Sequence, residues 1–204
     1  MARRDFNPGT LLAPLPCALV SVGDMENSNL ITIGWTGILS SDPPRTYISV
    51  RPSRYSHKIL LERGEFVINL TTEAIARATD YAGIYTGAKV DKFEKCHLTK
   101  AESKCVAAPT VAESPVALEC KVFDVIHSGT HDIFMADIVS VSCDEGLLDE
   151  KGRICFERAG LIAYSHGEYF ALGKKIGKFG FSTDKPKPSS HRRRHPKKKT
   201  EGKK

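Results

Sequence analysis

The feature that most constrains this chain is a succession of short apolar runs, each bounded by turn-forming residues. Residues 17–22 and 29–35 are two such runs, joined by the polar segment 23–28, and a third covers 46–50 after an Asp-Pro-Pro sequence. Their length and their content of Val, Ile, Leu and Thr are typical of β-strands. The sequence predicts further strands at 65–70, 116–126 and 131–143.

Two of the predicted strands alternate between two kinds of side chain. In 116–126, every second residue from Val116 to Val122 is apolar, whereas Glu119 and Lys121 face the other way. This period of two predicts a half-buried strand with a polar face. The same alternation recurs in the last strand, where one face has Ile133, Met135, Asp137 and Val139 and the other has Phe134, Ala136, Ile138 and Ser140.

Two short helices are expected among the strands. Ser53 or Ser56 is predicted to cap the first helix, which ends at Gly64, because serine favours helix starts and glycine favours helix ends. The Thr-Thr pair at 71–72 is predicted to open a second helix that runs to Gly83. Since strands outnumber helices and follow one another as in hairpins, the sequence predicts an antiparallel barrel with short helices packed outside it.

The positive charge of the chain is concentrated at its C-terminal end. The whole chain has 30 Lys and Arg against 24 Asp and Glu, a net charge of +6. Residues 184–204 hold ten of the basic and two of the acidic residues, which leaves 20 basic and 22 acidic residues in 1–183, a net charge of about −2. This segment has no large apolar residue, so we expect a disordered basic tail.

Neither a membrane span nor a secreted chain is predicted. No stretch approaches the ~18 consecutive apolar residues that a span needs, and the N-terminal segment has no clean signal sequence, so we expect a cytoplasmic protein. Cys17, Cys120 and Cys143 lie in apolar runs, where cysteine behaves as a small hydrophobe. Cys96 and Cys105 match no common metal-ligand spacing, so we expect no metal site.

Several familiar catalytic and nucleotide-binding motifs are missing from the sequence. There is no Gly-x-Ser-x-Gly, no His-Glu-x-x-His and no Rossmann glycine pattern. The glycine- and lysine-rich segment 173–180 lacks the spacing of a phosphate-binding loop and is interpreted as a basic connector. Hydrolase and dinucleotide-fold interpretations therefore have little support.

The remaining binding candidates are polar and aromatic residues at the ends of predicted elements, where scaffolds usually present binding groups. They are Asn29, Trp35, Arg54, Ser56, Lys92 and His131. Each also has a purely structural explanation. Trp35 can be a core aromatic and His131 can simply open a strand, while Arg54 and Lys92 can be solvated cations. Residue types alone therefore predict a β-barrel without a defined function.

The order and spacing of several motifs add a family resemblance. Residues 14–70 contain a Pro-led first strand, an Asn-x-x-Thr segment followed by Trp, a small-residue stretch ending in Asp-Pro-Pro, a Ser before a short helix, and Gly-Glu-Phe leading to Val-Ile-Asn-Leu. The segments 90–95, 108–120, 131–141 and 169–182 continue in the same order. Over about residues 10–182 the chain resembles the flavin reductase-like family of FMN-binding split barrels, and within it the flavoredoxin branch.

This resemblance implies a mostly β, six-stranded antiparallel split barrel with short peripheral helices over residues 1–183. It also implies FMN as the cofactor and a homodimer with FMN at or near the subunit interface. Ser56, Lys92 and an arginine would hold the FMN phosphate, and Trp35 and Tyr164 would contact the ring. The full set of implied cofactor contacts is Asn29, Trp35, Thr36, Ser40, Arg54, Ser56, Lys92, His131 and Tyr164.

Three functions follow as hypotheses from the resemblance and the charge pattern. The first is an FMN-containing oxidoreductase of flavoredoxin type, which takes electrons from NAD(P)H or a ferredoxin-like donor and passes them on. The second is a flavin reductase that uses NAD(P)H and releases reduced flavin as its product. The third, which we regard as the weakest, is a nucleic-acid-binding barrel whose basic tail contacts phosphates.

Overall fold

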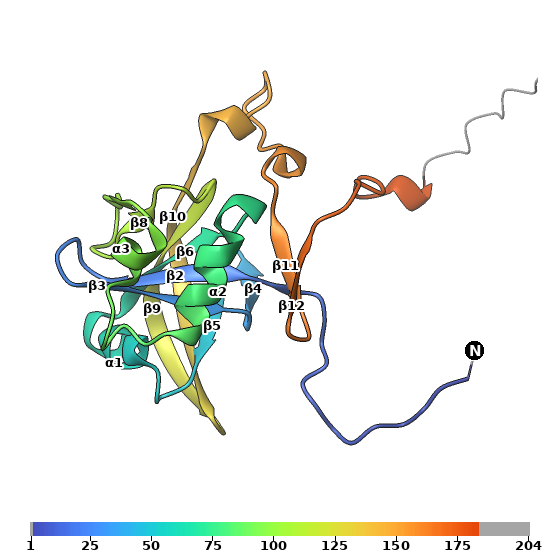
Figure 1. Cartoon of the computed structure of the whole chain (residues 1–204). Coiled ribbons are helices and arrows are strands. Elements are labelled where there is room, and N and C mark those ends of the chain that lie inside the picture. The colour runs from blue at the N-terminus through green and yellow to red at the C-terminus, as the bar shows by residue number, and fades with distance from the viewer. Residues whose placement is uncertain (1, 184–204) are drawn as a thin grey trace, which may run out of the picture. The chain divides into compact units, whose positions relative to one another are not determined.

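The computed structural model describes residues 2–183 and divides the chain into two units. One unit ends at Gly173 and contains the sheets and helices described below (Figure 1). The other begins at Lys174, and its described part holds the 3-10 helix η4, Phe181–Thr183. The predicted basic tail, residues 184–204, lies outside the described residues.

Seven strands form the main sheet of the first unit. They are β2 (Ala18–Gly23), β3 (Ser28–Ile33), β4 (Thr36–Ser41), β5 (Pro44–Val50), β6 (Glu65–Leu70), β9 (Val116–Ser128) and β10 (His131–Cys143). Their order across the sheet is β3-β2-β6-β9-β10-β5-β4, and every neighbouring pair is antiparallel. All six strands predicted from the sequence are present, and β4 is an additional one.

The edges of this sheet meet because of its connectivity. The two edge strands, β3 and β4, are consecutive in the chain and are joined only by Gly34 and Trp35. Seven flat strands would place the edges about 29 Å apart, far more than a two-residue link can span. The backbone N–H of Ser49 in β5 also donates to the carbonyl of Trp35 at 3.0 Å. The mostly β, split-barrel class is therefore confirmed, with seven strands instead of the expected six.

The interior of the barrel is filled by one face of these strands. Val20, Ile48, Phe66 and Phe134 are fully buried there, and Leu60 of the first helix packs with them. The alternation predicted for β10 is confirmed in this region, since Phe134 and its neighbour Ala136 point into the core.

The outer face of β9 is less polar than the alternation predicts. Lys121 is exposed, but Glu119 is only 2% exposed. Its carboxylate accepts the backbone N–H groups of Lys104 at 3.0 Å and Cys105 at 2.5 Å. The predicted polar face is therefore exposed only in part, because the loop before β8 folds over Glu119 and supplies hydrogen bonds in place of water.

Three short helices flank the barrel: α1 (Tyr55–Arg63), α2 (Ala76–Ile84) and α3 (Lys92–Cys96) (Figure 1). A 3-10 turn, η1 (Glu73–Ile75), leads into α2, and a small ladder joins β7 (Lys100–Ala101) to β8 (Thr110–Val111). Helices α2 and α3 pack on the outer side of β2 and β3. The buried residues of this contact are Leu19, Leu30, Ile75, Ala82, Phe93, Leu98 and Val111.

The helix ends agree only in part with the predicted signals. Gly64 ends α1 in the left-handed conformation, with φ 64°, as expected. The residue before α1 is Arg54, and no side chain caps the N-terminus, so the predicted caps Ser53 and Ser56 were wrong. Ser56 lies inside the helix and is buried, because its hydroxyl contacts Asn29 of β3.

Gly83 does not end the second helix. It lies within α2, and a Cβ atom there would approach the Cβ of Thr32 to 3.3 Å. The glycine therefore permits the close approach of α2 to β3, and the helix continues to Ile84. The predicted start of this helix agrees better with the structure, since Thr72 is the residue before η1, which leads into α2.

A second, three-stranded sheet stands beside the barrel. It consists of β1 (Leu15–Pro16), β11 (Ile162–Ser165) and β12 (Glu168–Ala171), in the order β1-β11-β12. The backbone N–H of Ile162 donates to the carbonyl of Thr71 at 3.2 Å, and that of Glu73 donates to Gly160 at 2.9 Å. These bonds fix the β11–β12 hairpin against the end of β6 and the start of η1.

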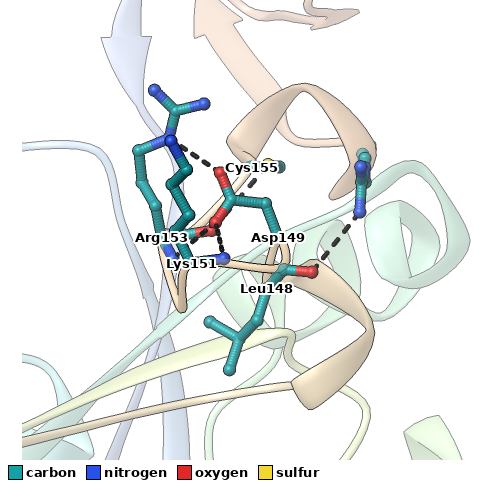
Figure 2. Close-up of polar contacts among 6 residues, drawn as sticks. Leu148, Asp149, Lys151, Arg153 and Cys155 are labelled. Carbon is teal, nitrogen blue, oxygen red and sulfur yellow. Dashed lines mark hydrogen bonds and ion pairs between the residues drawn. The ribbon is translucent and has the colours of Figure 1, made fainter.

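The connection from β10 to this hairpin is held by hydrogen bonds to the carboxylates of Asp144 and Asp149. It contains the 3-10 turns η2 (Glu145–Leu147) and η3 (Phe156–Arg158). Between them, Asp149 accepts the backbone N–H groups of Lys151 at 3.0 Å and Arg153 at 2.9 Å, and the Nε of Arg153 at 3.2 Å (Figure 2). These hydrogen bonds lower the pKa of the Asp149 carboxyl, and the one from the backbone N–H of Arg153 has the largest effect.

Candidate functional site

Two adjoining cavities lie where the ends of β3 and β5 meet α1, α2 and the β11–β12 hairpin. One has a volume of about 320 Å³ and the other about 400 Å³. Ile31, Arg51 and Arg54 line both, so the cavities form one groove. We call the first the aromatic cavity and the second the polar cavity.

Four rings make up much of the aromatic cavity. Trp35 and His131 lie with their ring centroids 4.6 Å apart, and Tyr164 and Tyr169 contact edge to face at 5.3 Å. Trp35 comes from the link between β3 and β4, His131 begins β10, and the tyrosines come from β11 and β12. The barrel and the small sheet thus each supply one pair of rings to the same cavity.

The surroundings of His131 disfavour protonation of its imidazole ring. Partial burial lowers its pKa, and the positive charge of Arg51 lowers it further. Its Nδ1 lies 2.9 Å from the hydroxyl of Thr130. An anion bound beside His131 and Arg51 would oppose this shift, since a nearby negative charge favours the protonated ring.

The polar cavity is built around a buried contact between β3 and α1. Nδ2 of Asn29 donates to the Oγ of Ser56 at 2.7 Å. Gly87 presses against this pair, since a Cβ there would lie 2.1 Å from Oδ1 of Asn29. The uncapped start of α1 lines the same cavity through Ser53, Arg54, Tyr55 and Ser56.

Lys92 reaches the polar cavity from the first turn of α3, where the carboxylate of Asp91 caps the helix. Its Nζ donates to the carbonyls of Leu30 at 2.7 Å and Ala82 at 2.8 Å, and the residue is only 4% exposed. Burial, and then the charge of Arg54, lower its pKa to about 8. An ammonium has three N–H groups, so one remains for a ligand.

Arg51 and Arg54 give the junction of the two cavities its positive charge. Within residues 2–183, no ion pair joins either guanidinium to a carboxylate. With Lys92 nearby, the groove holds three cationic side chains around one junction. Such a cluster is suited to an anion, because arginine pairs well with phosphate and carboxylate oxygens.

Seven of the nine residues predicted to contact the cofactor line the groove. Trp35, His131 and Tyr164 line the aromatic cavity, Asn29, Ser56 and Lys92 line the polar cavity, and Arg54 lines both. Thr36 and Ser40 line neither. Thr36 donates its hydroxyl to the carbonyl of Tyr47 at 2.5 Å, and Ser40 donates to that of Asp42 at 3.3 Å. Their contact with a cofactor stays a prediction.

Some residues of the groove were not among the predicted ones. Arg51 directly follows β5 in the sequence Arg-Pro-Ser-Arg, so its place after a strand was the available signal. Asp80 and Tyr169 carry no local signal, because α2 and β12 meet only in the folded chain. Cys17 is buried, as expected of a small hydrophobe, but it also lines the aromatic cavity. Burial raises the pKa of its thiol to about 11.

The part of the chain that the structure describes has neither a metal-binding cluster nor a membrane-spanning helix. In residues 2–183, no cluster of three or more His, Cys, Asp or Glu side chains is arranged to hold a metal ion. No helix in that same stretch is both long and apolar enough to cross a membrane.

The flavin reductase like domain matches residues 11–173 of this chain. The chain belongs to the flavin reductase-like family. The match covers the barrel, the small sheet and every residue of the groove. The groove is therefore the site to examine for a flavin.

Two solved structures resemble this chain over nearly its whole length. Flavoredoxin of Desulfovibrio vulgaris (Miyazaki F) is 32% identical with a TM-score of 0.83, covering 90% of this chain and 100% of that one. An FMN-binding protein from Thermus thermophilus, solved with bound 1-cyclohex-2-enone, is 26% identical with a TM-score of 0.71, covering 87% and 98%.

A curated relative adds a link to flavin reduction. The reductase component of an FADH(2)-dependent resorcinol hydroxylase from Rhizobium sp. (strain MTP-10005) is 24% identical over 152 residues, which are 72% of this chain and 80% of the relative. Flavoredoxins and reductase components therefore both occur among the relatives of this chain.

The residue types of the groove suit a flavin that carries a phosphate. Its polar cavity supplies cations and a hydroxyl suited to a phosphate, and its aromatic cavity supplies flat rings suited to a flat apolar ring. The N-terminus of α1, which no side chain caps, adds backbone N–H groups and the positive end of a helix dipole to the polar cavity.

Proposed function

We propose that this chain binds FMN in the groove and is an oxidoreductase of flavoredoxin type. The single observation that carries the proposal is the continuity of the two cavities through Arg51 and Arg54, with cations on one side and aromatic rings on the other. The 32% identity to a flavoredoxin over 90% of the chain supports it. Bound FMN would supply the redox chemistry, and the protein would supply position and electrostatics.

The phosphate of FMN would lie in the polar cavity. Ser56 can donate its hydroxyl hydrogen there, since Asn29 occupies only its oxygen. Arg54 and the remaining N–H of Lys92 would neutralise the dianion, and the start of α1 would contribute backbone N–H groups. Each hydrogen bond to a charged group contributes about 1.5 to 3 kcal/mol.

The flavin ring would lie in the aromatic cavity. Trp35 and Tyr164 offer stacking or edge contacts, which add about 0.5 to 1.5 kcal/mol beyond area burial. The edge strand β4 leaves backbone N–H and C=O groups without a partner strand, so Thr36 and Ser40 can act through their backbone. His131 would contact the same ring or a neighbouring polar group.

The proposed reaction begins with a reduced nicotinamide or a ferredoxin-like donor and ends with transfer of the electrons to an acceptor. An anaerobic assay of the purified protein against NADH, NADPH and reduced ferredoxin tests this step. Bleaching of the bound flavin absorbance by one of these donors is the expected result. No bleaching by any of the three, from a protein that holds flavin, would contradict the proposed donors.

A flavin reductase that releases reduced flavin is the second candidate, favoured by the reductase component among the relatives. The two candidates differ in how firmly the protein holds flavin. Stoichiometric FMN after gel filtration supports the flavoredoxin type, whereas loss of flavin together with rapid NAD(P)H-dependent reduction of added flavin supports the reductase.

We also propose that the protein is cytoplasmic and that it forms a homodimer. The barrel exposes apolar side chains on three strands: Ile38 and Leu39 of β4, Phe123, Val125 and Ile126 of β9, and Val139 and Val141 of β10. Monomers seldom expose many neighbouring apolar residues, so a second copy is the expected cover. Light scattering of the purified protein should give twice the 22.4 kDa mass of one chain.

A further inference from the structure

Among residues 2–183, Asp80 contributes the one carboxylate to the walls of the aromatic cavity. The other described residues that line it are apolar, aromatic, small or cationic. Asp80 lies on α2, and its Oδ1 accepts the hydroxyl of Tyr169 from β12 at 3.0 Å. This hydrogen bond fixes the carboxylate at the cavity and joins α2 to the hairpin that carries Tyr164.

The negative charge of Asp80 acts on other groups in the cavity. Tyr169 has a raised pKa, first because of burial and then because it donates to Asp80 and lies beside its charge. Asp80 also contributes to the raised pKa of the Cys17 thiol, after the larger effect of burial. A cofactor in the same cavity would experience the same charge.

The remaining charges of the cavity have the opposite sign. Arg51 and Arg54 line its junction with the polar cavity, and His131 lies beside Arg51. They would favour a negatively charged ligand. The charge of Asp80 is therefore opposite in sign to the other charges of the groove, and no feature of phosphate binding requires a carboxylate at this place.

We propose that Asp80, positioned by Tyr169, lowers the reduction potential of the bound flavin and so makes the reduced protein a stronger electron donor. This inference rests on the proposed function. On reduction the ring gains two electrons and takes up one or two protons from solvent, so it becomes more electron-rich and, with one proton, more negative. A fixed carboxylate opposes that change and favours the oxidised ring.

The size of the effect follows from the exposure of the carboxylate. Asp80 is exposed to solvent on one side, so water and salt weaken its field. A unit charge at a distance of several ångströms in a partly solvated site corresponds to about a three- to tenfold change in an equilibrium constant. We expect a change of this size in the ratio of the dissociation constants of reduced and oxidised FMN.

Asp80→Asn tests the proposal, because the amide removes the charge while its oxygen can still accept from Tyr169. The FMN-loaded full chain is titrated anaerobically with dithionite, which supplies the two electrons, against a reference dye. The expected result is a more positive midpoint potential, corresponding to about three- to tenfold tighter relative binding of the reduced flavin. The shift should shrink when the salt concentration is raised.

Two further variants separate charge from structure. Tyr169→Phe keeps the charge of Asp80 but removes the hydroxyl that holds the carboxylate at the cavity, so its potential should lie between those of the unaltered protein and Asp80→Asn. Glu73→Gln removes the same charge from the turn that leads into α2, at a position that does not line the cavity. Its potential should equal that of the unaltered protein.

The results distinguish a failure of the role proposed for Asp80 from a failure of the proposed flavin binding. A midpoint potential of Asp80→Asn that is unchanged or more negative, or an equal rise in Glu73→Gln, would overturn the role of Asp80. Should the Asn variant not hold FMN, Asp80→Ser gives the same neutral test. An unaltered protein that binds no flavin would instead overturn the proposed function.

Discussion

The pKa of Lys92 should affect both the stability of the free protein and its affinity for an anion. In the free protein its pKa is lowered to about 8, chiefly by burial. Between pH 8 and its ordinary value of 10.5 the unfolded chain therefore binds more protons, so stability of the free protein rises with pH in that window. A bound phosphate dianion reverses the preference, because it stabilises the charged ammonium.

This coupling predicts a pH-dependent affinity for FMN. As the pH rises from 7 to 9.5, binding must increasingly protonate Lys92, so the affinity should fall above about pH 8 by up to about tenfold per pH unit. Fluorescence titration of the apoprotein across this range measures it. Lys92→Met keeps the buried stem and should bind FMN more weakly with little pH dependence. A flat profile for the unaltered protein would contradict the role of Lys92.

The phosphate contacts should contribute more affinity than the ring contacts. Lys92→Ala and Ser56→Ala remove charge-assisted hydrogen bonds and should weaken FMN binding by about one to two decades each. Tyr164→Phe should weaken it less, because the ring area is retained, and so should Asn29→Ala, because Asn29 is uncharged and its Nδ2 already donates to Ser56. Titration of the four apoproteins with FMN gives the ranking. Equal affinity of Lys92→Ala and the unaltered protein would refute the phosphate assignment.

Gly87 offers a test of the geometry of the polar cavity. A methyl group there would lie 2.1 Å from Oδ1 of Asn29, whose side chain is short, buried and already bonded to Ser56. Gly87→Ala should therefore displace Asn29 and cost about 1 to 3 kcal/mol of stability, with weaker FMN binding. Thermal unfolding and FMN titration measure both. Gly173→Ala, where no atom of residues 2–183 other than its chain neighbours lies within 4 Å of the new methyl group, should change neither.

At the scale of elements, the sequence predicts what depends on local patterns. The six expected strands and the stop at Gly64 follow from alternation and from the conformational freedom of glycine, and the structure has them. The errors involve contacts between distant segments. Ser56 contacts Asn29 instead of capping α1, and Gly83 serves the packing of α2 on β3.

The missed strand β4 has a related explanation. Its residues Thr36–Ser41 have an irregular burial pattern, with Ile38 and Leu39 both exposed, so they do not alternate as a half-buried strand does. The strand is formed by pairing with β5, across a register shift between Ile38 and Ser40. Pairing of this kind is a property of the folded sheet and is not visible in a single segment.

The candidate site could be predicted only through its overall pattern. Asn29, Ser56, Lys92, His131 and Tyr164 come from five separate elements, and each alone has a structural explanation. Their order along the chain, together with the family resemblance, predicted residues that the fold brings to one groove. Asp80 and Tyr169 were not predicted because Asp80 belongs to no motif, Tyr169 only begins the family-like segment 169–182, and their contact joins residues 89 positions apart.

At the scale of the whole molecule, the basic C-terminal segment should be separable from the flavin site. Residues 184–204 have a balance of +8, against about −2 for the rest of the chain. Deleting them should leave the unfolding temperature and flavin content unchanged while sharply reducing retention on heparin. A truncated protein that fails to fold or loses flavin would show instead that the segment is structural.

The tail also decides the nucleic-acid hypothesis. Affinity for nucleic acid that falls steeply with salt and disappears on deletion of residues 184–204 would demonstrate binding by the tail. Such binding would be compatible with a flavin in the groove, because the groove lies wholly within residues 15–169.

The identity and amount of flavin bound to the purified full-length chain test the central claim most directly. The groove has one cavity with cationic side chains and one with aromatic rings, and the sequence has no Rossmann-type motif for an adenine half. We predict a yellow protein that releases about one FMN per chain on denaturation, with an apoprotein whose melting temperature rises on addition of FMN. Release of FAD, or an apoprotein whose melting temperature does not respond to FMN, would contradict the account.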